Sequence, residues 1–263
     1  MRKTILTILL FISSFGFSQY NDPIASQMST KFVQADAYIG NDNIGFDYFL
    51  KNSTLFKLKG SAKYQYKNIY FGKISKVDLQ NPLRIVVFYE NFNTIIALDN
   101  QLNEIEKTNL SEYNPNTIAS AVGMASRNNY WIFDQTNQQL GLFNFKKKSF
   151  QTIGVALSSP IKTYAATYNL FFWIDQENKL YCSDIFGKRN EIATLPPYDT
   201  IYLTDESVLA YQKDEKLYLY DIRKKTSTVI ENIEKTFISF SYKNQNLAIF
   251  TSEGITNYKI NLP

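Results

Sequence analysis

The 263-residue sequence has no histidine and only one cysteine, and these two shortages exclude several kinds of catalytic site. Without histidine there is no Ser-His-Asp or Cys-His nucleophile system, no histidine-ligated metal and no histidine general base. The single cysteine, Cys182, excludes an internal disulfide and a cysteine-cluster metal site. Its place in the run Leu180, Tyr181, Cys182, Ser183 indicates a small side chain buried on a strand rather than a reactive thiol.

Glycine and proline are also scarce, with 10 and 7 residues, and no glycine-rich phosphate-binding loop occurs. An Asp-x-Asp-x-Asp calcium loop and the glycine and Trp-Asp signatures of the WD repeat are absent as well. Helical periodicity is nowhere sustained, whereas aromatic residues make up 16% of the chain, which favours sheet. The sequence therefore predicts an all-β protein that uses no cofactor and no metal.

The N-terminus, residues 1–18, has the features of a secretory signal peptide. Arg2 and Lys3 precede an uncharged apolar stretch over residues 4–17, and small residues stand before a cleavage site at Gln19. A retained membrane anchor is the alternative, but the apolar stretch is short for a span. Export together with a single cysteine indicates a bacterial envelope protein.

The charge balance gives little support for a nucleic-acid partner. Loss of the signal peptide leaves 26 basic against 24 acidic residues, a net charge of about +2. No second apolar segment of spanning length follows, so the processed protein is expected to be soluble or peripheral. Residues 19–30 are predicted to be a polar lead-in, and residues 31–263 a single β domain long enough to bury a large core.

A pattern of strands recurs along this domain with a period near 40 residues. It is clearest over residues 128–154, where a continuous apolar run (130–133), a mixed strand (140–145) and an alternating strand (149–153) follow one another. Equivalent apolar second strands end at six positions that lie 37 to 45 residues apart: Lys51, Tyr89, Asp134, Asp175, Gln212 and Thr251. This spacing is typical of a four-stranded propeller blade.

The chain ends offer a way to close such a ring. The sixth unit lacks an outer strand, while residues 31–39 form a spare strand near the N-terminus. Pairing the two would remove an open edge. The sequence therefore predicts a six-bladed β-propeller with four-stranded antiparallel blades, closed by the N-terminal strand. A β-sandwich is the alternative, but it does not explain the period near 40 residues.

Two carboxylates occupy equivalent places at the ends of second strands, Asp134 and Asp175. If both faced a central channel, they could serve as the acid pair of a carbohydrate-active enzyme, a glycoside hydrolase or a lyase. The alternative, that each caps a tight polar turn, is favoured because the other blades have no acid at this place. A third hypothesis is a propeller that binds a glycan or small ligand in an aromatic-lined channel.

Basic residues gather at one recurring place, the turn between the third and fourth strands of a blade. Three successive blades carry them there: Lys146, Lys147, Lys148, Lys188, Arg189, Arg223, Lys224 and Lys225. Because equivalent turns emerge on the same face of a propeller, we expect a basic arc that docks an acidic protein surface or anionic lipid headgroups. The alternative, that these charges only keep the hairpins soluble and guard the outer edge strands, is the one that the sequence favours.

The crossover loops on the opposite face carry tyrosine beside proline. Tyr113 precedes Asn114 and Pro115, and Tyr198 follows Pro196 and Pro197. Stiff amphipathic contacts of this kind are favoured at protein interfaces. The alternative is a tyrosine lid that packs on the end of the propeller.

The Arg-Lys start, the Phe-Gly-Phe-Ser-Gln junction over residues 15–19 and the bias toward Asn, Lys, Ile and Tyr resemble exported proteins of the Bacteroidota. With blades of about 40 residues, the whole processed chain resembles small non-catalytic propellers of that envelope. Among these are the PorD-like periplasmic proteins that accompany the outer-membrane translocon of the type IX secretion and gliding machinery. The resemblance implies a periplasmic, non-enzymatic accessory or assembly subunit at the outer membrane. Its expected partner is an outer-membrane or periplasmic protein, with peripheral contact to an anionic membrane surface.

Overall fold

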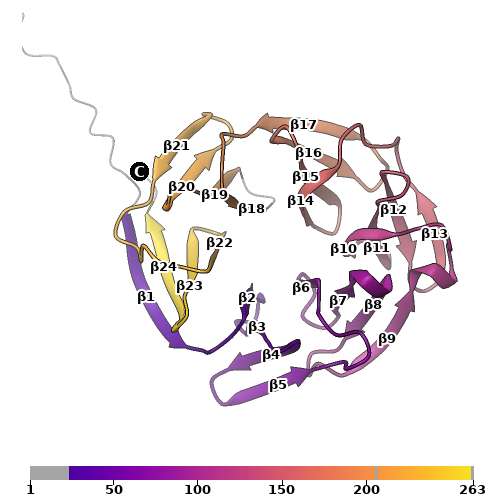
Figure 1. Ribbon diagram of the computed structural model, residues 1–263, viewed down its shortest axis with the longest axis horizontal. Coiled ribbons are helices and arrows are strands. Elements are labelled where there is room, and N and C mark those ends of the chain that lie inside the picture. Colours follow the sequence, from indigo (N-terminus) through magenta and orange to yellow (C-terminus); the bar gives the residue numbers. More distant parts are fainter. Residues whose placement is uncertain (1–23, 205–206, 262–263) are drawn as a thin grey trace, which may run out of the picture.

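The computed structural model describes residues 24–204 and 207–261. Six four-stranded sheets stand around a common centre, so the protein is a six-bladed β-propeller, as predicted (Figure 1). In each sheet the hydrogen-bonded order runs from the innermost to the outermost strand, and every pairing is antiparallel. The predicted signal peptide, residues 1–18, lies outside the described residues.

The first three blades follow one another in the chain. Blade 1 contains β2 (Ala37–Asn41), β3 (Asp47–Lys51), β4 (Thr54–Lys59) and β5 (Ala62–Tyr66). Blade 2 contains β6 (Lys76–Asp78), β7 (Ile85–Tyr89), β8 (Thr94–Leu98) and β9 (Glu104–Asn109), with short 3-10 helices η1 (Glu90–Phe92) and η2 (Leu110–Glu112). Blade 3 contains β10 (Ala119–Ala125), β11 (Asn129–Asp134), β12 (Gln139–Asn144) and β13 (Ser149–Thr152).

The last three blades repeat this plan, and the sixth borrows its outer strand from the N-terminal end. Blade 4 contains β14 (Ile161–Ala166), β15 (Leu170–Asp175), β16 (Lys179–Asp184) and β17 (Arg189–Thr194). Blade 5 contains β18 (Thr200–Tyr202), β19 (Val208–Lys213), β20 (Lys216–Asp221) and β21 (Thr226–Val229). Blade 6 contains β22 (Ser239–Lys243), β23 (Asn246–Phe250), β24 (Gly254–Asn261) and β1 (Ile24–Phe32).

The core lies between blades rather than within them. The second strands are almost wholly buried in blades 2, 3 and 4, since β7 is buried at all five positions and β11 and β15 at five of six, while β3 and β19 are buried at three positions each. A strand covered on both sides is apolar at nearly every position, which explains the continuous apolar runs of the sequence, and the buried acids at the ends of β11 and β15, Asp134 and Asp175, are exceptions. Outer strands show the opposite pattern, and in β1 only Ala25 is buried.

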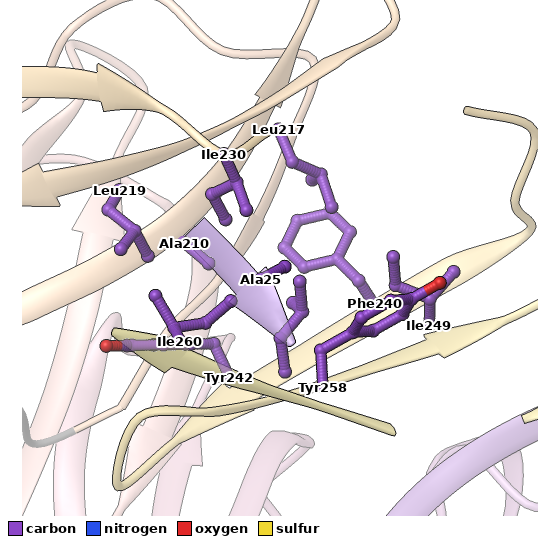
Figure 2. Packing of buried hydrophobic residues seen from close by; sticks show 11 residues of the cluster. Ala25, Ala210, Leu217, Leu219, Ile230, Phe240, Tyr242, Ile249, Tyr258 and Ile260 are labelled. Carbon is purple, nitrogen blue, oxygen red and sulfur yellow. The ribbon is translucent and has the colours of Figure 1, made fainter. Parts of the chain in front are cut away.

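The ring closes where β1 pairs with β24, from Ile24 opposite Asn261 to Phe32 opposite Gly254. Ala25 enters an apolar cluster shared by blades 5 and 6, and Figure 2 shows it among Leu217, Ile230 and Phe240. β1 therefore completes the sixth sheet and joins the two ends of the described chain. The N-terminal closure was predicted correctly.

The residues that make this closure differ from the prediction. The predicted closing strand, residues 31–39, spans the end of β1 and the start of β2, and residues 24–30 of the predicted lead-in belong to β1. The reason is physical: β1 buries one side chain, so its Ser, Gln and Thr residues resemble a solvated lead-in. The more apolar residues near position 38 belong instead to the innermost strand of blade 1.

Polar contacts reinforce the seam between blades 6 and 1. The Lys31 ammonium of β1 forms an ion pair with Asp47 of β3. The Tyr38 hydroxyl donates to the other oxygen of Asp47 at 3.1 Å. The buried apolar cluster here has only three members, Ala248, Phe250 and Ile255, whereas the other seams have nine to eleven. The closure therefore depends on main-chain pairing and this polar cluster more than on apolar burial.

Candidate functional site

The basic turns of blades 3, 4 and 5 share one construction. In each, the acidic or amide side chain that ends the third strand accepts hydrogen bonds from main-chain N–H groups of the turn. Asn144 receives them from residues 146 and 147, Asp184 from residues 186 and 188, and Asp221 from residues 223 and 224, at 2.8 to 3.1 Å. Because these side chains fix the backbone, the basic side chains are not needed to hold the turns.

Most of the predicted basic residues remain open to solvent. Six are exposed and form no side-chain ion pair or hydrogen bond within the part of the chain that the structure describes: Lys146, Lys147, Lys188, Arg223, Lys224 and Lys225. The turns lie at equivalent places in three consecutive blades, along the circumference where the outer strands run (Figure 1). They are thus available for a partner, and their role in binding remains a prediction.

Lys148 is used inside the protein instead. Its ammonium pairs with Glu106, on the outer strand of blade 2, and lies 5.9 Å from the ring centre of Tyr113. Arg84 binds the other oxygen of Glu106 and donates to the Tyr130 hydroxyl at 2.9 Å. This cluster joins the turn of blade 3 to the preceding blade, so Lys148 stabilises the seam.

Glu106 makes the seam between blades 2 and 3 sensitive to acid. Burial alone would raise the pKa of Glu106, but hydrogen bonds and positive charge from Lys148 and Arg84 outweigh it and hold the pKa below the ordinary 4.5. The unfolded chain then takes up this proton first as the pH falls. The stabilisation that the charged Glu106 gives the folded protein is complete above pH 4.5, the ordinary pKa of glutamate. It is lost as the pH falls through the lower pKa that Glu106 has in the folded protein.

We therefore expect Glu106→Gln to lower the free energy of unfolding by about 2 kcal/mol at pH 7. The difference between the variant and the native protein should shrink below pH 4.5. Urea unfolding at a series of pH values measures both quantities. A difference that stays constant down to pH 3 would contradict the assignment.

Arg189 is also used inside the protein. Its guanidinium donates to the Val155 carbonyl at 2.7 Å and lies 5.5 Å from the Trp173 ring centre. Burial lowers the pKa of Arg189. Since Val155 follows the outer strand of blade 3, this contact again ties a turn to the preceding blade. Of the eight predicted basic residues, Lys148 and Arg189 therefore have structural partners.

The two predicted tyrosines pack against the propeller. Tyr113 is 40% exposed and its ring lies 5.3 Å from that of Phe143. Tyr198 is half-buried against the core between blades 4 and 5, with the Lys162 ammonium 4.1 Å from its ring centre. Both contacts fit the packing-lid alternative, and Tyr113 keeps an exposed edge that a partner can reach.

Asp134 and Asp175 both cap turns. Asp134 Oδ1 accepts from the main-chain N–H groups of Ile118 and Thr136 at 3.2 and 3.0 Å, and its Oδ2 accepts from the Asn137 side chain at 2.6 Å. Asp175 Oδ1 accepts from two N–H groups of its own turn, both at 2.9 Å. The favoured turn interpretation therefore agrees with the structure, because both carboxylates hold turns.

Removing the Asp134 carboxylate should cost stability. We expect Asp134→Ala to lower the free energy of unfolding by about 3 kcal/mol, because buried donors are left without acceptors. Asp134→Asn, which keeps one carbonyl oxygen, should cost less than half as much. Urea unfolding of the two variants tests this, and an alanine variant as stable as the native protein would contradict the capping role.

Sequence reasoning missed a charged group on the innermost strands. The Asp78 carboxylate of β6 accepts from the Met124 and Gln80 main-chain N–H groups at 2.7 and 2.8 Å, and burial raises its pKa. On the same strand, the Lys76 ammonium lies 5.0 Å from the ring centre of Tyr164, and desolvation lowers its pKa. The only sequence signal was two charged residues flanking a valine in a three-residue strand.

Within residues 24–204 and 207–261, no three His, Cys, Asp or Glu side chains gather as metal ligands would. The same residues form no helix with the length and apolar character of a membrane span.

No family model matches the sequence, and no curated protein matches it. Solved structures do match. Virginiamycin B lyase from Staphylococcus aureus has a TM-score of 0.57 at 12% identity, over 85% of this chain and 79% of the lyase. The Cps50 (Swd1) β-propeller domain of Myceliophteria thermophila has a TM-score of 0.58 at 8% identity, over 90% and 100%. A Bacteroides thetaiotaomicron protein of unknown function has a TM-score of 0.56 at 12% identity, over 90% and 72%.

These similarities show the fold alone. A lyase and a Swd1 domain match equally well, so the propeller does not decide between an enzyme and a binding protein. The PorD-like identity remains a hypothesis drawn from the sequence.

Proposed function

We propose that this protein is a non-enzymatic, exported propeller that binds a protein partner at the outer membrane as an accessory or assembly subunit. The type IX secretion translocon is the complex that the sequence resemblance suggests. The observation that carries the proposal is the set of six exposed basic side chains on three preformed turns of consecutive blades. A rigid scaffold with fixed turns loses little conformational entropy on binding.

The charge of these turns suggests the chemistry of the partner. Lysine and arginine held along one sector of the rim are complementary to an acidic protein surface. Such charges mainly raise the association rate and select the partner, so binding is expected to weaken with salt. The six residues named above as exposed would make this contact, and Lys148 and Arg189 would not.

The enzyme alternative has less support from the residues. One matched structure is a histidine-to-alanine variant of the staphylococcal lyase, which is described as catalytically inactive. This chain contains no histidine. A lyase reaction here would need a different catalytic group, and Asp134 and Asp175 are both engaged in capping turns.

Co-purification from the native envelope in mild detergent tests the proposal. The tagged protein is compared with a variant in which Lys146, Lys147, Lys224 and Lys225 are changed to Ser. A control variant carries the same change at four exposed lysines outside these turns: Lys67, Lys73, Lys216 and Lys235.

We expect the native protein and the control to recover one outer-membrane or periplasmic partner in near-equal amount. The turn variant should recover at least tenfold less, since each lost charge contact weakens binding by roughly 0.5–1 kcal/mol. Recovery of a lone monomer would overturn the proposal. Equal recovery by both variants would move the interface away from the basic turns.

A further inference from the structure

Two strongly exposed apolar side chains lie at the seam between blades 3 and 4. Phe186, in the turn after β16, is 74% exposed, and Val155, in the crossover after β13, is 73% exposed. Exposure of this degree means that both side chains project from the surface. Exposed apolar side chains that gather at one place, rather than standing singly, are a mark of an interaction site.

The two loops that carry these side chains are locked together. Gly187 has a φ of +86°, and a Cβ at this position would lie 2.5 Å from the Gly154 nitrogen, so the backbones touch. Arg189 donates to the Val155 carbonyl at 2.7 Å, which adds a second link. The Asp184 carboxylate accepts from the main-chain N–H of Phe186 at 2.9 Å. Phe186 and Val155 therefore form one preorganised pair rather than two mobile tips.

Basic residues lie on the Phe186 side of this pair. The Arg127 guanidinium lies 5.6 Å from the ring centre of Phe186. Asn144 donates to the Arg127 carbonyl at 3.2 Å while its oxygen caps the turn of Lys146 and Lys147, so these two lysines belong to the same region. Lys188 follows Phe186 by two residues and is exposed.

One acidic residue, Asp184 at the end of β16, lies beside Phe186 of the turn that follows. One of its carboxylate oxygens already accepts two main-chain hydrogen bonds, so it fixes the turn in place. The region is therefore basic around an apolar centre.

We propose that Phe186 and Val155, with Arg127 and Lys188 beside them, form a site that docks on an anionic lipid bilayer. The two apolar side chains would enter the headgroup region, and the cations would contact lipid phosphates. Projecting apolar groups fit a fluid bilayer, which adapts to their shape. The positive charges of Arg127 and Lys188 match the negative surface charge of anionic lipids. Lys188 also belongs to the exposed residues assigned above to the protein partner, so the two contacts would share it; the inference does not otherwise depend on the proposed protein-binding function.

Vesicle flotation with the purified protein tests this site. The probes are vesicles of phosphatidylcholine with 30% phosphatidylglycerol and vesicles of phosphatidylcholine alone. We expect binding to the anionic vesicles that weakens as salt is raised, and little binding to the neutral ones. Phe186→Ser should weaken binding about tenfold, and Arg127→Ser and Lys188→Ser about fivefold each.

Phe32→Ser is the matched control, because Phe32 is 81% exposed on β1 and lies outside this seam. It should bind vesicles as the native protein does. No binding to anionic vesicles at low salt would overturn the inference, as would binding that is unchanged by Phe186→Ser. Loss of a protein partner by Phe186→Ser without any vesicle binding would assign the pair to a protein interface and also overturn it. The vesicle assay contains no partner protein, so a failure to bind vesicles does not contradict the proposed protein-binding function.

Discussion

A chain shortened to begin at Val33 is expected to lose its cooperative fold, whereas one that begins at Ile24 should keep it. Removing β1 takes away the partner of β24 along its whole length, from Asn261 to Gly254. It also removes Lys31, the cation that pairs with the Asp47 carboxylate, whose side chain is only 10% exposed. In addition, it exposes the apolar cluster that contains Ala25 to solvent. Each lost main-chain hydrogen bond costs about 1 kcal/mol. The total is comparable to the whole stability of a domain, which is about 5–15 kcal/mol.

Circular dichroism during heating and size-exclusion chromatography measure this effect. The chain that begins at Ile24 should unfold in one transition near that of the native protein. The chain that begins at Val33 should show no cooperative transition or should aggregate through the exposed edge of β24. Equal melting temperatures for the two chains would contradict the closure described for β1.

The largest effect expected from a single substitution is at Gly254, the residue of β24 that faces the end of β1. Its φ is +154°, a conformation that residues with a side chain rarely adopt, and a Cβ there would lie 2.0 Å from the Lys31 carbonyl oxygen. Gly254→Ala therefore strains its own backbone and pushes β1 away. We expect a loss of about 4 kcal/mol in the free energy of unfolding. In a chain of this size that corresponds to a fall of roughly 10 °C in melting temperature.

Gly60→Ala provides the control for this prediction. Gly60 also has a positive φ, +56°, but no atom lies within 4 Å of a Cβ placed there. This variant should lose only about 1 kcal/mol from the unfavourable backbone conformation. If both alanine variants melted at the same temperature, close contact between β1 and β24 would not explain the cost at Gly254.

The fold was predictable because successive blades of a propeller bury equivalent strands, which gives the sequence a repeating pattern of apolar runs. The apolar run over residues 130–133 lies in β11, which is covered on both sides, and its counterparts in other blades recur for the same reason. The closing strand was placed incorrectly because an outermost strand is held by main-chain pairing. Such pairing leaves almost no trace in the side chains of β1.

The candidate site was only partly predictable. The turns with Lys146, Lys147 and Lys224 stand out as charged runs between strands. The partners of Lys148 and Arg189 lie 42 and 34 residues away, so only the ring geometry brings them together. The exposure of Phe186 was equally unpredictable from the sequence. An apolar residue after a strand resembles a continuation of that strand, and the position of Phe186 depends on the contact between two loops.

Site-specific photo-crosslinking in the native envelope tests the central claim, that the basic turns bind a protein partner, most directly. A photoreactive residue is placed at Lys147 or Lys224, in the turns of blades 3 and 5. For comparison, it is placed at Gln135 or Asp214, exposed positions in the same blades at the other end of the third strand. The account predicts one heavier crosslinked species from Lys147 and Lys224 and none from the comparison positions. Crosslinking from the comparison positions alone, or from none of the four, would contradict it.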